Sequence, residues 1–183
     1  MSDTRTSPIA KLVATSAEIR AILDHPTEMV KFGVKGRGLV EWAERHEIEL
    51  PVQLYDTLPV GEGGVLVRVG EGELILECAA DDPLLSRFNA ALETAGADVY
   101  RIEQQAVTLV LKGDRALGIL AQACGVNFAA EPVNRMVYTR VAGASCGVLP
   151  QDEGGQRVYR LWIDYSLAPH LWETLAEIAG NRQ

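Results

Sequence analysis

Apolar residues follow two patterns along this chain: short β-branched runs, and stripes in which they recur at helical spacing. Residues 104–124 contain both patterns. Residues 106–111 are apolar and β-branched, which predicts a strand buried on both faces. Lys112-Gly113 ends the run, because glycine accepts backbone angles that a β-carbon forbids. Asp114 then stands where a side chain can cap a helix, and the helical stripe follows at Ala116, Leu117, Leu120, Ala123 and Cys124.

The same order of strand, turn and helix occurs earlier in the chain. Residues 28–34 alternate loosely and predict a strand, Lys35-Gly36 ends it, and residues 39–46 carry apolar positions at helical spacing. The motif apolar–x–apolar–Lys–Gly therefore occurs twice, at residues 32–36 and 109–113, which lie 77 residues apart. This recurrence indicates an internal duplication.

The remaining pattern extends the repeat. It predicts a short helix near residues 17–23, strands at 64–69 and 73–78, a helix at 83–95 capped by Asp81-Asp82, strands at 136–141, 144–149 and 158–163, and a final helix after Ser166. Each half then consists of strand, helix, antiparallel strands and helix. We expect an α+β fold made of two duplicated half-domains about a pseudo-twofold axis. Its parts are an N-terminal arm with a short helix (residues 1–27), a first half (28–97) and a second half (98–183), packed as one compact unit.

Charge and length limit the function. The 183 residues include 25 acidic and 17 basic ones, for a net charge of −8, which argues against a nucleic-acid partner because the net field repels a polyanion. Lys31, Lys35 and Arg37 come nearest to a basic patch, and we interpret them as solvated surface. We expect no membrane partner, because no apolar run approaches the ~18–20 residues of a spanning helix. The N-terminus lacks the pattern of a signal peptide, which favours the cytosol.

Few residues suggest chemistry. Cys78, Cys124 and Cys146 lie far apart without a CxxC pair, which favours buried thiols over metal ligands or disulfides. The three histidines, His25, His46 and His170, occur singly, so no metal site is predicted. The dinucleotide motif GxGxxG and the zinc motif HExxH do not occur. We therefore predict no catalytic residues in this chain.

Four separated segments resemble the γ-subunit family of sarcosine oxidase. They are VKFGVKGRGLVEWAERHEIELP, VLVRVGEGELILEC, IEQQAVTLVLKGDRALGILAQACGVNF and WIDYSLAPHLWETLAE, in that order with compatible gaps, and they span about residues 28–180. The wider superfamily includes the folate-binding domains of the glycine-cleavage aminomethyltransferase (T-protein), dimethylglycine oxidases and tRNA-modification factors. The resemblance therefore implies the fold of the T-protein folate-binding domain.

The resemblance also implies a role. Such γ-subunits belong to flavoenzymes that oxidise N-methyl amino acids and pass the one-carbon unit to tetrahydrofolate, and the larger subunits hold the flavins and the dinucleotide. By this resemblance the chain is a non-catalytic accessory subunit in one-carbon metabolism. It would bind no cofactor alone, folate and flavin belonging to larger partner subunits.

The sequence departs from its relatives at the place where the aminomethyltransferase carries a pterin-binding carboxylate. The matching residues are Val158-Tyr159-Arg160, and an arginine can only donate hydrogen bonds. The Lys-Gly-Cys-Tyr-x-Gly-Gln motif of the tRNA-modification relatives is also not matched at residues 122–126. By the resemblance, the candidates for a cleft are Arg140, Arg160, Trp162 and Asp164; from the residues alone, a packed tryptophan and a surface ion network are the alternative.

Two other functions remain open at this point. One is a stand-alone folate-binding or aminomethyltransferase-like protein, which would bind a reduced folate without partners. The other is a self-associating domain with an unassigned role.

Overall fold

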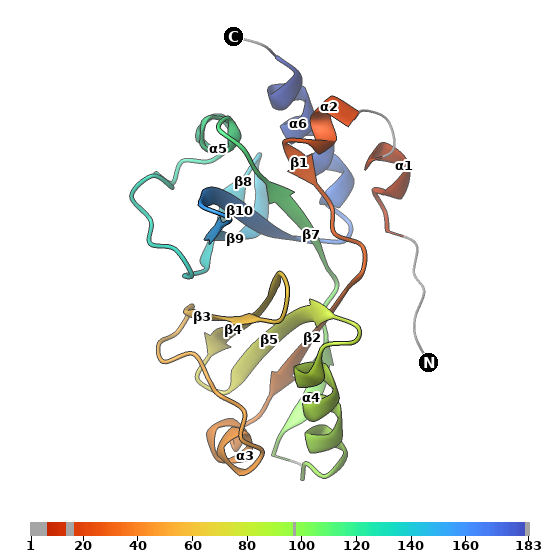
Figure 1. Ribbon diagram of the computed structural model, residues 1–183, viewed down its shortest axis with the longest axis vertical. Coiled ribbons are helices and arrows are strands. Elements are labelled where there is room, and N and C mark those ends of the chain that lie inside the picture. The colour runs from red at the N-terminus through yellow and green to blue at the C-terminus, as the bar shows by residue number, and fades with distance from the viewer. Residues whose placement is uncertain (1–6, 14–16, 97, 182–183) are drawn as a thin grey trace. The chain divides into compact units, whose positions relative to one another are not determined.

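The computed structural model describes residues 7–13, 17–96 and 98–181, and they form two compact units. One unit, here called the continuous unit, comprises residues 28–104; the other, the split unit, comprises residues 1–27 together with 105–183. Each is built on one five-stranded sheet whose neighbouring strands are all antiparallel (Figure 1). The predicted α+β class is confirmed.

The continuous unit contains the predicted strands and helices in the predicted order, together with two strands, at residues 57–60 and 100–103, that were not predicted. Its elements are β2 (Met29–Lys35), α3 (Leu39–Arg45), β3 (Thr57–Val60), β4 (Gly64–Gly70), β5 (Glu73–Ala79), α4 (Pro83–Glu93) and β6 (Tyr100–Glu103). The strand order in the sheet is β3-β4-β5-β2-β6. The predicted cap of α4 is confirmed, because the Asp82 carboxylate accepts a hydrogen bond of 2.8 Å from the Leu84 amide.

One face of this sheet packs against α3 and α4, and alternate residues of β2 belong to that face. Phe32 and Val34 are buried in a cluster with Leu39 and Trp42 of α3 and Phe88 of α4. The Phe88 ring meets the rings of Phe32 and Trp42 edge to face, with centroids 6.0 and 5.6 Å apart. This geometry suits aromatic rings whose edges and faces carry opposite partial charge.

The split unit takes its strands from both ends of the chain. Its elements are α1 (Ala10–Val13), α2 (Ala17–Arg20), β1 (Leu23–Asp24), β7 (Ala106–Leu111), α5 (Ala116–Ala123), β8 (Val137–Val141), β9 (Ala144–Glu153), β10 (Gln156–Asp164) and α6 (Ala168–Gly180). The sheet order is β1-β7-β10-β9-β8. Ile9, near the N-terminus, is fully buried in the core of this unit.

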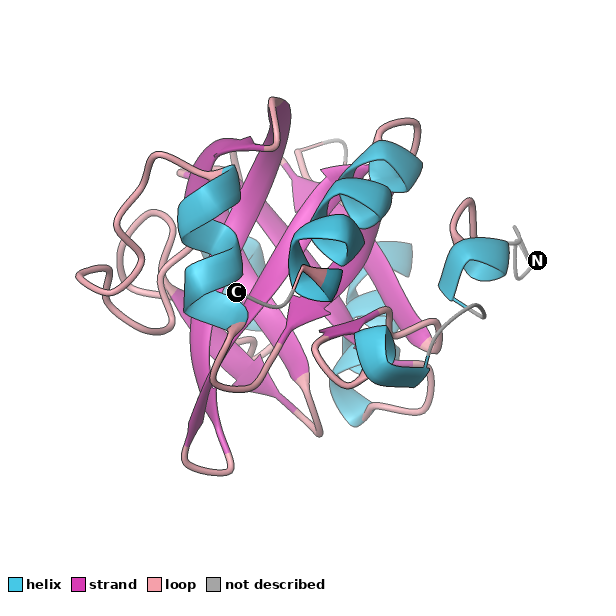
Figure 2. Cartoon of the chain, turned by 90° about the horizontal axis from the view of Figure 1, so that it is seen from above, coloured by secondary structure: helices cyan, strands magenta, loops and turns pink. Residues whose placement is uncertain are grey.

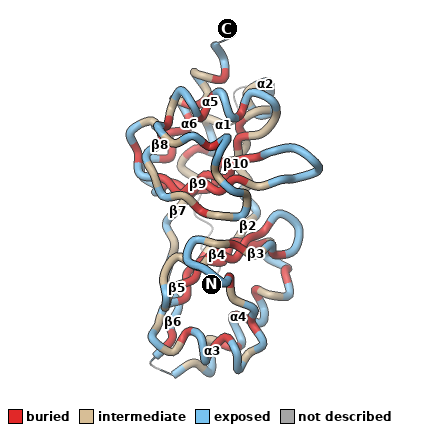
Figure 3. Tube along the Cα trace, turned by 90° about the vertical axis from the view of Figure 1, so that its left-hand side faces the viewer, coloured by how far each residue is buried: buried red, intermediate tan, exposed pale blue. Residues whose placement is uncertain are grey.

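The terminal helix is the main apolar element of the split unit. Leu171, Trp172 and Leu175 of α6 lie in the core with Leu161 and Ile163 of β10, and the predicted final helix is confirmed. Figure 2 shows the helices lying against the strands, and Figure 3 shows buried positions concentrated on β9, β10 and β4. Each such large side chain contributes roughly 1.5–3 kcal/mol when fully buried.

The connectivity of the two sheets supports the predicted duplication. Written from the edge, the orders β6-β2-β5-β4-β3 and β1-β7-β10-β9-β8 correspond strand by strand. The edge strands are exchanged, however: β1 precedes β2 in the chain but pairs with β7, and β6 precedes β7 but pairs with β2. Each sheet therefore takes one edge strand from one repeat and its other four strands from the other repeat.

Three features differ from the sequence-based expectation. Residues 100–103, assigned to the second half (98–183), pair with β2 in the continuous unit, and part of the predicted helix at 17–23 is the strand β1. The predicted Asp114 cap is wrong: α5 begins after Arg115, and no side chain caps it. Gly113 has φ +80°, and the turn it starts closes with a hydrogen bond from the Ala116 amide to the Gly113 carbonyl. This turn moves the helix start past Asp114.

Arg115 has a different role at that helix start. Its guanidinium donates to the carbonyls of Ala179 and Asn181, at 2.8 and 3.0 Å, at the end of α6. A cation is favourable there because the last carbonyls of a helix carry partial negative charge. Within the described residues, no helix has the length and apolarity needed to cross a membrane.

Candidate functional site

The four residues proposed from the resemblance share one face of the split-unit sheet. Arg160, Trp162 and Asp164 occupy alternate positions of β10, so their side chains project from the same face. Arg140 lies on β8. Tyr138 of β8 pairs with Gly147 of β9, and Gly147 pairs with Trp162 of β10. Tyr138 and, two residues later, Arg140 therefore project from the same face as Trp162. Two strand spacings, about 10 Å, separate the β8 and β10 backbones.

Two of these side chains have hydrogen-bond partners nearby in the split unit. The Arg160 guanidinium is 4% exposed; its Nε donates to Gln151 Oε1 at 2.9 Å, and its Nη2 lies 4.0 Å from Glu153 Oε1. The exposed Asp164 accepts hydrogen bonds from the amide and hydroxyl of Ser166, at 2.9 and 2.5 Å. These bonds lower the pKa of Asp164 because they stabilise the charged carboxylate.

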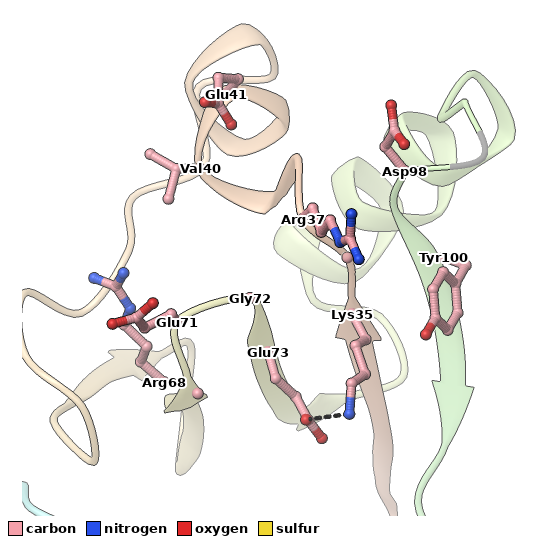
Figure 4. A pocket seen from close by; sticks show the side chains of 12 residues that line it. Lys35, Arg37, Val40, Glu41, Arg68, Glu71, Gly72, Glu73, Asp98 and Tyr100 are labelled. Carbon is pink, nitrogen blue, oxygen red and sulfur yellow. Dashed lines mark ion pairs between the residues drawn. The ribbon is translucent and has the colours of Figure 1, made fainter.

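A second candidate is an open cleft of about 980 Å³ in the continuous unit (Figure 4). Its walls are the turn after β2, the start of α3, the β4–β5 hairpin and the segment leading into β6. The lining residues are Lys35, Gly36, Arg37, Val40, Glu41, Arg68, Gly70, Glu71, Gly72, Glu73, Asp98 and Tyr100. No pattern in the sequence predicted this cleft.

Two glycines let three backbone segments meet at this cleft. The Gly36 amide donates to the Gly72 carbonyl at 2.9 Å. A β-carbon on Gly36 would lie 1.7 Å from the Asp98 carbonyl oxygen, and one on Gly72 would lie 2.6 Å from the Gly36 carbonyl oxygen. Neither position has space for a side chain, so glycine at both sites keeps the turn, the hairpin and the segment before β6 in contact.

The charges in the cleft are mixed. Lys35 Nζ lies 2.9 Å from Glu73 Oε2, and this hydrogen bond raises the pKa of Lys35 because it stabilises the ammonium form. Arg68 Nη1 donates to the carbonyls of Pro51 and Val52 at 3.3 and 3.2 Å. Its Nε is buried without a hydrogen-bond partner among the described residues. Three cations and four carboxylates line the cleft, an arrangement suited to groups of both signs rather than to a polyanion.

The split unit has a smaller cleft at the corresponding place. It measures about 430 Å³ and is lined by the turn at Gly113, by Leu117 of α5 and by the β9–β10 hairpin around Gly155. Gly113 corresponds to Gly36 in the repeated Lys-Gly motif, and the hairpin tip at Gly155 corresponds to that at Gly72. The duplication therefore includes the cleft as well as the sheets.

Thiol, imidazole and aliphatic hydroxyl side chains lie outside the larger cleft. Among the described residues that line the larger cleft there is no cysteine, histidine, serine or threonine. All three cysteines are buried, as predicted, and burial raises the pKa of the Cys78 thiol to about 11, with smaller effects from the Asp82 and Glu77 charges. In the described part of the chain, no group of three or more metal-ligating side chains comes together.

His25 and His170 have hydrogen-bond partners within the split unit. His25 Nδ1 lies 2.7 Å from the Thr108 carbonyl and its Nε2 lies 2.7 Å from Ser7 Oγ. His170 Nε2 lies 3.0 Å from the Ala142 carbonyl. These contacts hold the ring of His25 between the N-terminal segment and β7.

The sequence matches no model of a known protein family and no curated protein. Solved structures with a similar fold include a chain of the heterotetrameric sarcosine oxidase from Corynebacterium sp. U-96 in complex with pyrrole 2-carboxylate, with a TM-score of 0.75 and 21% identity. That match covers 96% of this chain and 94% of the other.

A second similar structure is the glycine cleavage system aminomethyltransferase T from Bartonella henselae, with a TM-score of 0.64 and 18% identity. The match covers 84% of this chain and 44% of the aminomethyltransferase, so this chain corresponds to less than half of that protein. At these identities the similarity establishes the fold. The expected fold, that of the T-protein folate-binding domain, is thereby confirmed.

Proposed function

We propose that this chain is a non-catalytic, γ-type subunit of a sarcosine oxidase-like flavoenzyme complex in one-carbon metabolism. The reciprocal coverage carries the proposal: this chain and one chain of a heterotetrameric sarcosine oxidase match over 96% and 94% of their lengths. The aminomethyltransferase chain, by contrast, is more than twice as long as the part of it that this chain matches. Because the match to the oxidase chain is nearly complete in both directions, it favours a subunit that acts in the cytosol beside larger partners.

The position of Arg160 supports the further proposal that folate and flavin are held by partner subunits. In the resemblance to the aminomethyltransferase, this position corresponds to a carboxylate that accepts hydrogen bonds from the pterin. Arg160 is instead a buried donor whose Nε is already bonded to Gln151. A guanidinium offers no acceptor to the amide and amino groups of a pterin.

The second candidate function, stand-alone folate binding or aminomethyl transfer, has one observation in its favour. The aminomethyltransferase match covers 84% of this chain, so most of the chain shares a fold that is used by that enzyme. The two functions differ in a simple property, since a stand-alone folate protein binds its ligand without other subunits.

The test combines purification and titration. The affinity-tagged full chain is isolated from its source, its assembly state is measured by native mass spectrometry, and the complex is inspected for flavin absorption. The chain without partners is then titrated calorimetrically with tetrahydrofolate. We expect a complex with larger, flavin-containing chains and no heat of folate binding. A lone chain that binds tetrahydrofolate at micromolar concentration would establish the second function, and a homo-oligomer without other chains would indicate self-association.

A further inference from the structure

An exposed apolar loop precedes β3 in the continuous unit. Its residues Val52, Gln53, Leu54 and Tyr55, here called the VQLY loop, are all exposed, whereas Pro51 and Thr57 on either side are buried. The exposed fraction is 84% for Val52, 37% for Leu54 and 39% for Tyr55. Three neighbouring apolar side chains that face solvent are typical of a surface that another protein covers.

Hydrogen bonds fix the conformation of this loop from both sides. Arg68 Nη1 donates to the Pro51 and Val52 carbonyls, as described for the cleft. The Tyr55 amide donates to the Arg68 carbonyl at 2.7 Å, and the Arg68 amide donates to the Asp56 carbonyl at 3.2 Å. Within the loop, the Asp56 amide donates to the Gln53 carbonyl at 3.2 Å. A loop held in this way loses little conformational entropy when a partner binds it.

The backbone of Tyr55 is also in an unfavourable conformation. Its φ is +71°, in the left-handed region that residues with a β-carbon seldom adopt. Strained residues persist only where surrounding contacts hold them, and they concentrate at binding and switch sites. Here the strained residue is a tyrosine whose ring is exposed at the surface. Aromatic rings are enriched among the residues that dominate protein–protein binding.

Charge indicates the kind of surface that would bind the loop. The continuous unit contains 15 acidic and 7 basic residues, whereas the split unit contains 10 of each, so the whole net charge of −8 belongs to the unit with the loop. Glu47 and Glu49, shortly before the loop, are exposed. A partner surface rich in lysine and arginine would be attracted to this unit by its net negative charge.

From these observations we propose that the VQLY loop is the docking element for a larger partner subunit, whose surface offers an apolar pocket with a basic rim. Val52, Leu54 and Tyr55 enter the pocket, and the carboxylates beside the loop pair with the rim. This inference rests on the proposed function, since it names the surface by which the subunit would join its complex.

The test uses the tagged full chain and the flavin-containing partner that co-purifies with it. The partner is separated, and its binding to wild-type chain and to Val52→Asp and Tyr55→Asp variants is measured at low and high salt. Leu167→Asp is the matched control, because Leu167 is 40% exposed and lies in the split unit. We expect Kd to rise by about tenfold or more for the loop variants and by less than about twofold for the control.

Two further readouts examine the loop directly. Hydrogen exchange of the amides at residues 52–55 is expected to slow in the wild-type complex. Carbodiimide, which joins carboxylates to amines in contact, is expected to link Glu47 or Glu49 to lysines of the partner. Melting temperatures check that the variants fold, and Val52→Asp carries the test if Tyr55→Asp disturbs the backbone, since Val52 is 84% exposed.

The possible failures are distinguishable. A wild-type chain that co-purifies with no flavin-containing subunit overturns the proposed function and the docking element together. A complex that forms equally well with both loop variants overturns the docking element alone. Loss of binding without cross-links to lysines, and without weakening at high salt, overturns the basic rim.

Discussion

Lys31 and Glu77 face each other across β2 and β5 and form an ion pair with Lys31 Nζ 3.4 Å from Glu77 Oε2. The Glu77 side chain is 0% exposed and the Lys31 side chain 8%. Both lie on the face of the sheet opposite Phe32 and Val34, which are packed against the helices. A charged pair is therefore buried on a sheet face that is remote from the aromatic core.

Breaking this pair by Lys31→Met is expected to lower the free energy of unfolding by about 3–5 kcal/mol, because the buried Glu77 carboxylate loses its cation. The double variant Lys31→Met/Glu77→Leu is expected to recover most of the loss. Urea denaturation measures both. The control is Lys35→Met, which breaks the solvent-screened Lys35–Glu73 pair and should cost much less than Lys31→Met. Additive losses in the double variant would contradict the expectation.

The cap of α4 gives a second prediction. Asp82→Ala removes the acceptor for the Leu84 amide and is expected to lower the free energy of unfolding by about 1 kcal/mol. Asp81→Ala is the control: it is exposed and adjacent, and its effect should stay within about 0.5 kcal/mol. Thermal and urea unfolding measure both variants. Equal losses would show that general charge, rather than the cap, is responsible.

The paired Lys-Gly turns allow a matched comparison. Gly36→Ala forces a β-carbon to within 1.7 Å of the Asp98 carbonyl oxygen, and we expect it to cost about 3 kcal/mol through backbone displacement. Gly113→Ala meets no atom within 4 Å but has φ +80°, so only conformational strain of about 1–2 kcal/mol is expected. The free energies of unfolding of the two variants should differ in that order, and the reverse order would contradict the crowded turn.

Cys78 predicts a loss of stability at alkaline pH. Its pKa is about 11 in the native protein, against 9.0 for an ordinary thiol. Between these values the unfolded chain has released the thiol proton and the native chain has not, so rising pH favours unfolding. The contribution is therefore complete below pH 9 and lost as the pH approaches 11.

Comparison with Cys78→Ala separates this effect from other titrations. The stability advantage of the wild-type protein over the variant is expected to shrink above pH 9 by about 1.4 kcal/mol per pH unit. Urea unfolding at a series of pH values measures it. An advantage that stays constant from pH 8 to pH 11 would show that Cys78 titrates as an exposed thiol.

The sequence predicts the long elements well because each carries its own periodic pattern. The apolar stripe of α6 and the alternating strand β2 extend over enough residues to distinguish helix from strand. The two-residue strand β1 has no such pattern, and only its pairing with Leu111 and Val110 defines it. Residues 100–103 have no buried position, so their membership of the continuous unit depends on partners 65 or more residues away in the chain.

The candidate site was less predictable. The alternation of Arg160, Trp162 and Asp164 on one strand could be recognised from the sequence, whereas the cleft depends on contacts between Gly36, Gly72 and Asp98 that no local pattern encodes. The solvated-surface interpretation of Lys31 was wrong for a similar reason. Its partner Glu77 comes from a strand 46 positions later, and nothing around either residue indicates that the pair is buried.

The exchanged strands β1 and β6 affect how the chain acquires its structure during synthesis. Residues 1–27 are synthesised before residues 28–183, yet the sheet partner of β1, the strand β7, begins only at residue 106. All strands of the continuous unit lie within residues 28–104, so its sheet can form before β7, the partner of β1, has been synthesised. The core around Ile9 and Leu23 closes last, after an intervening domain has been made, which makes translation order part of the folding pathway.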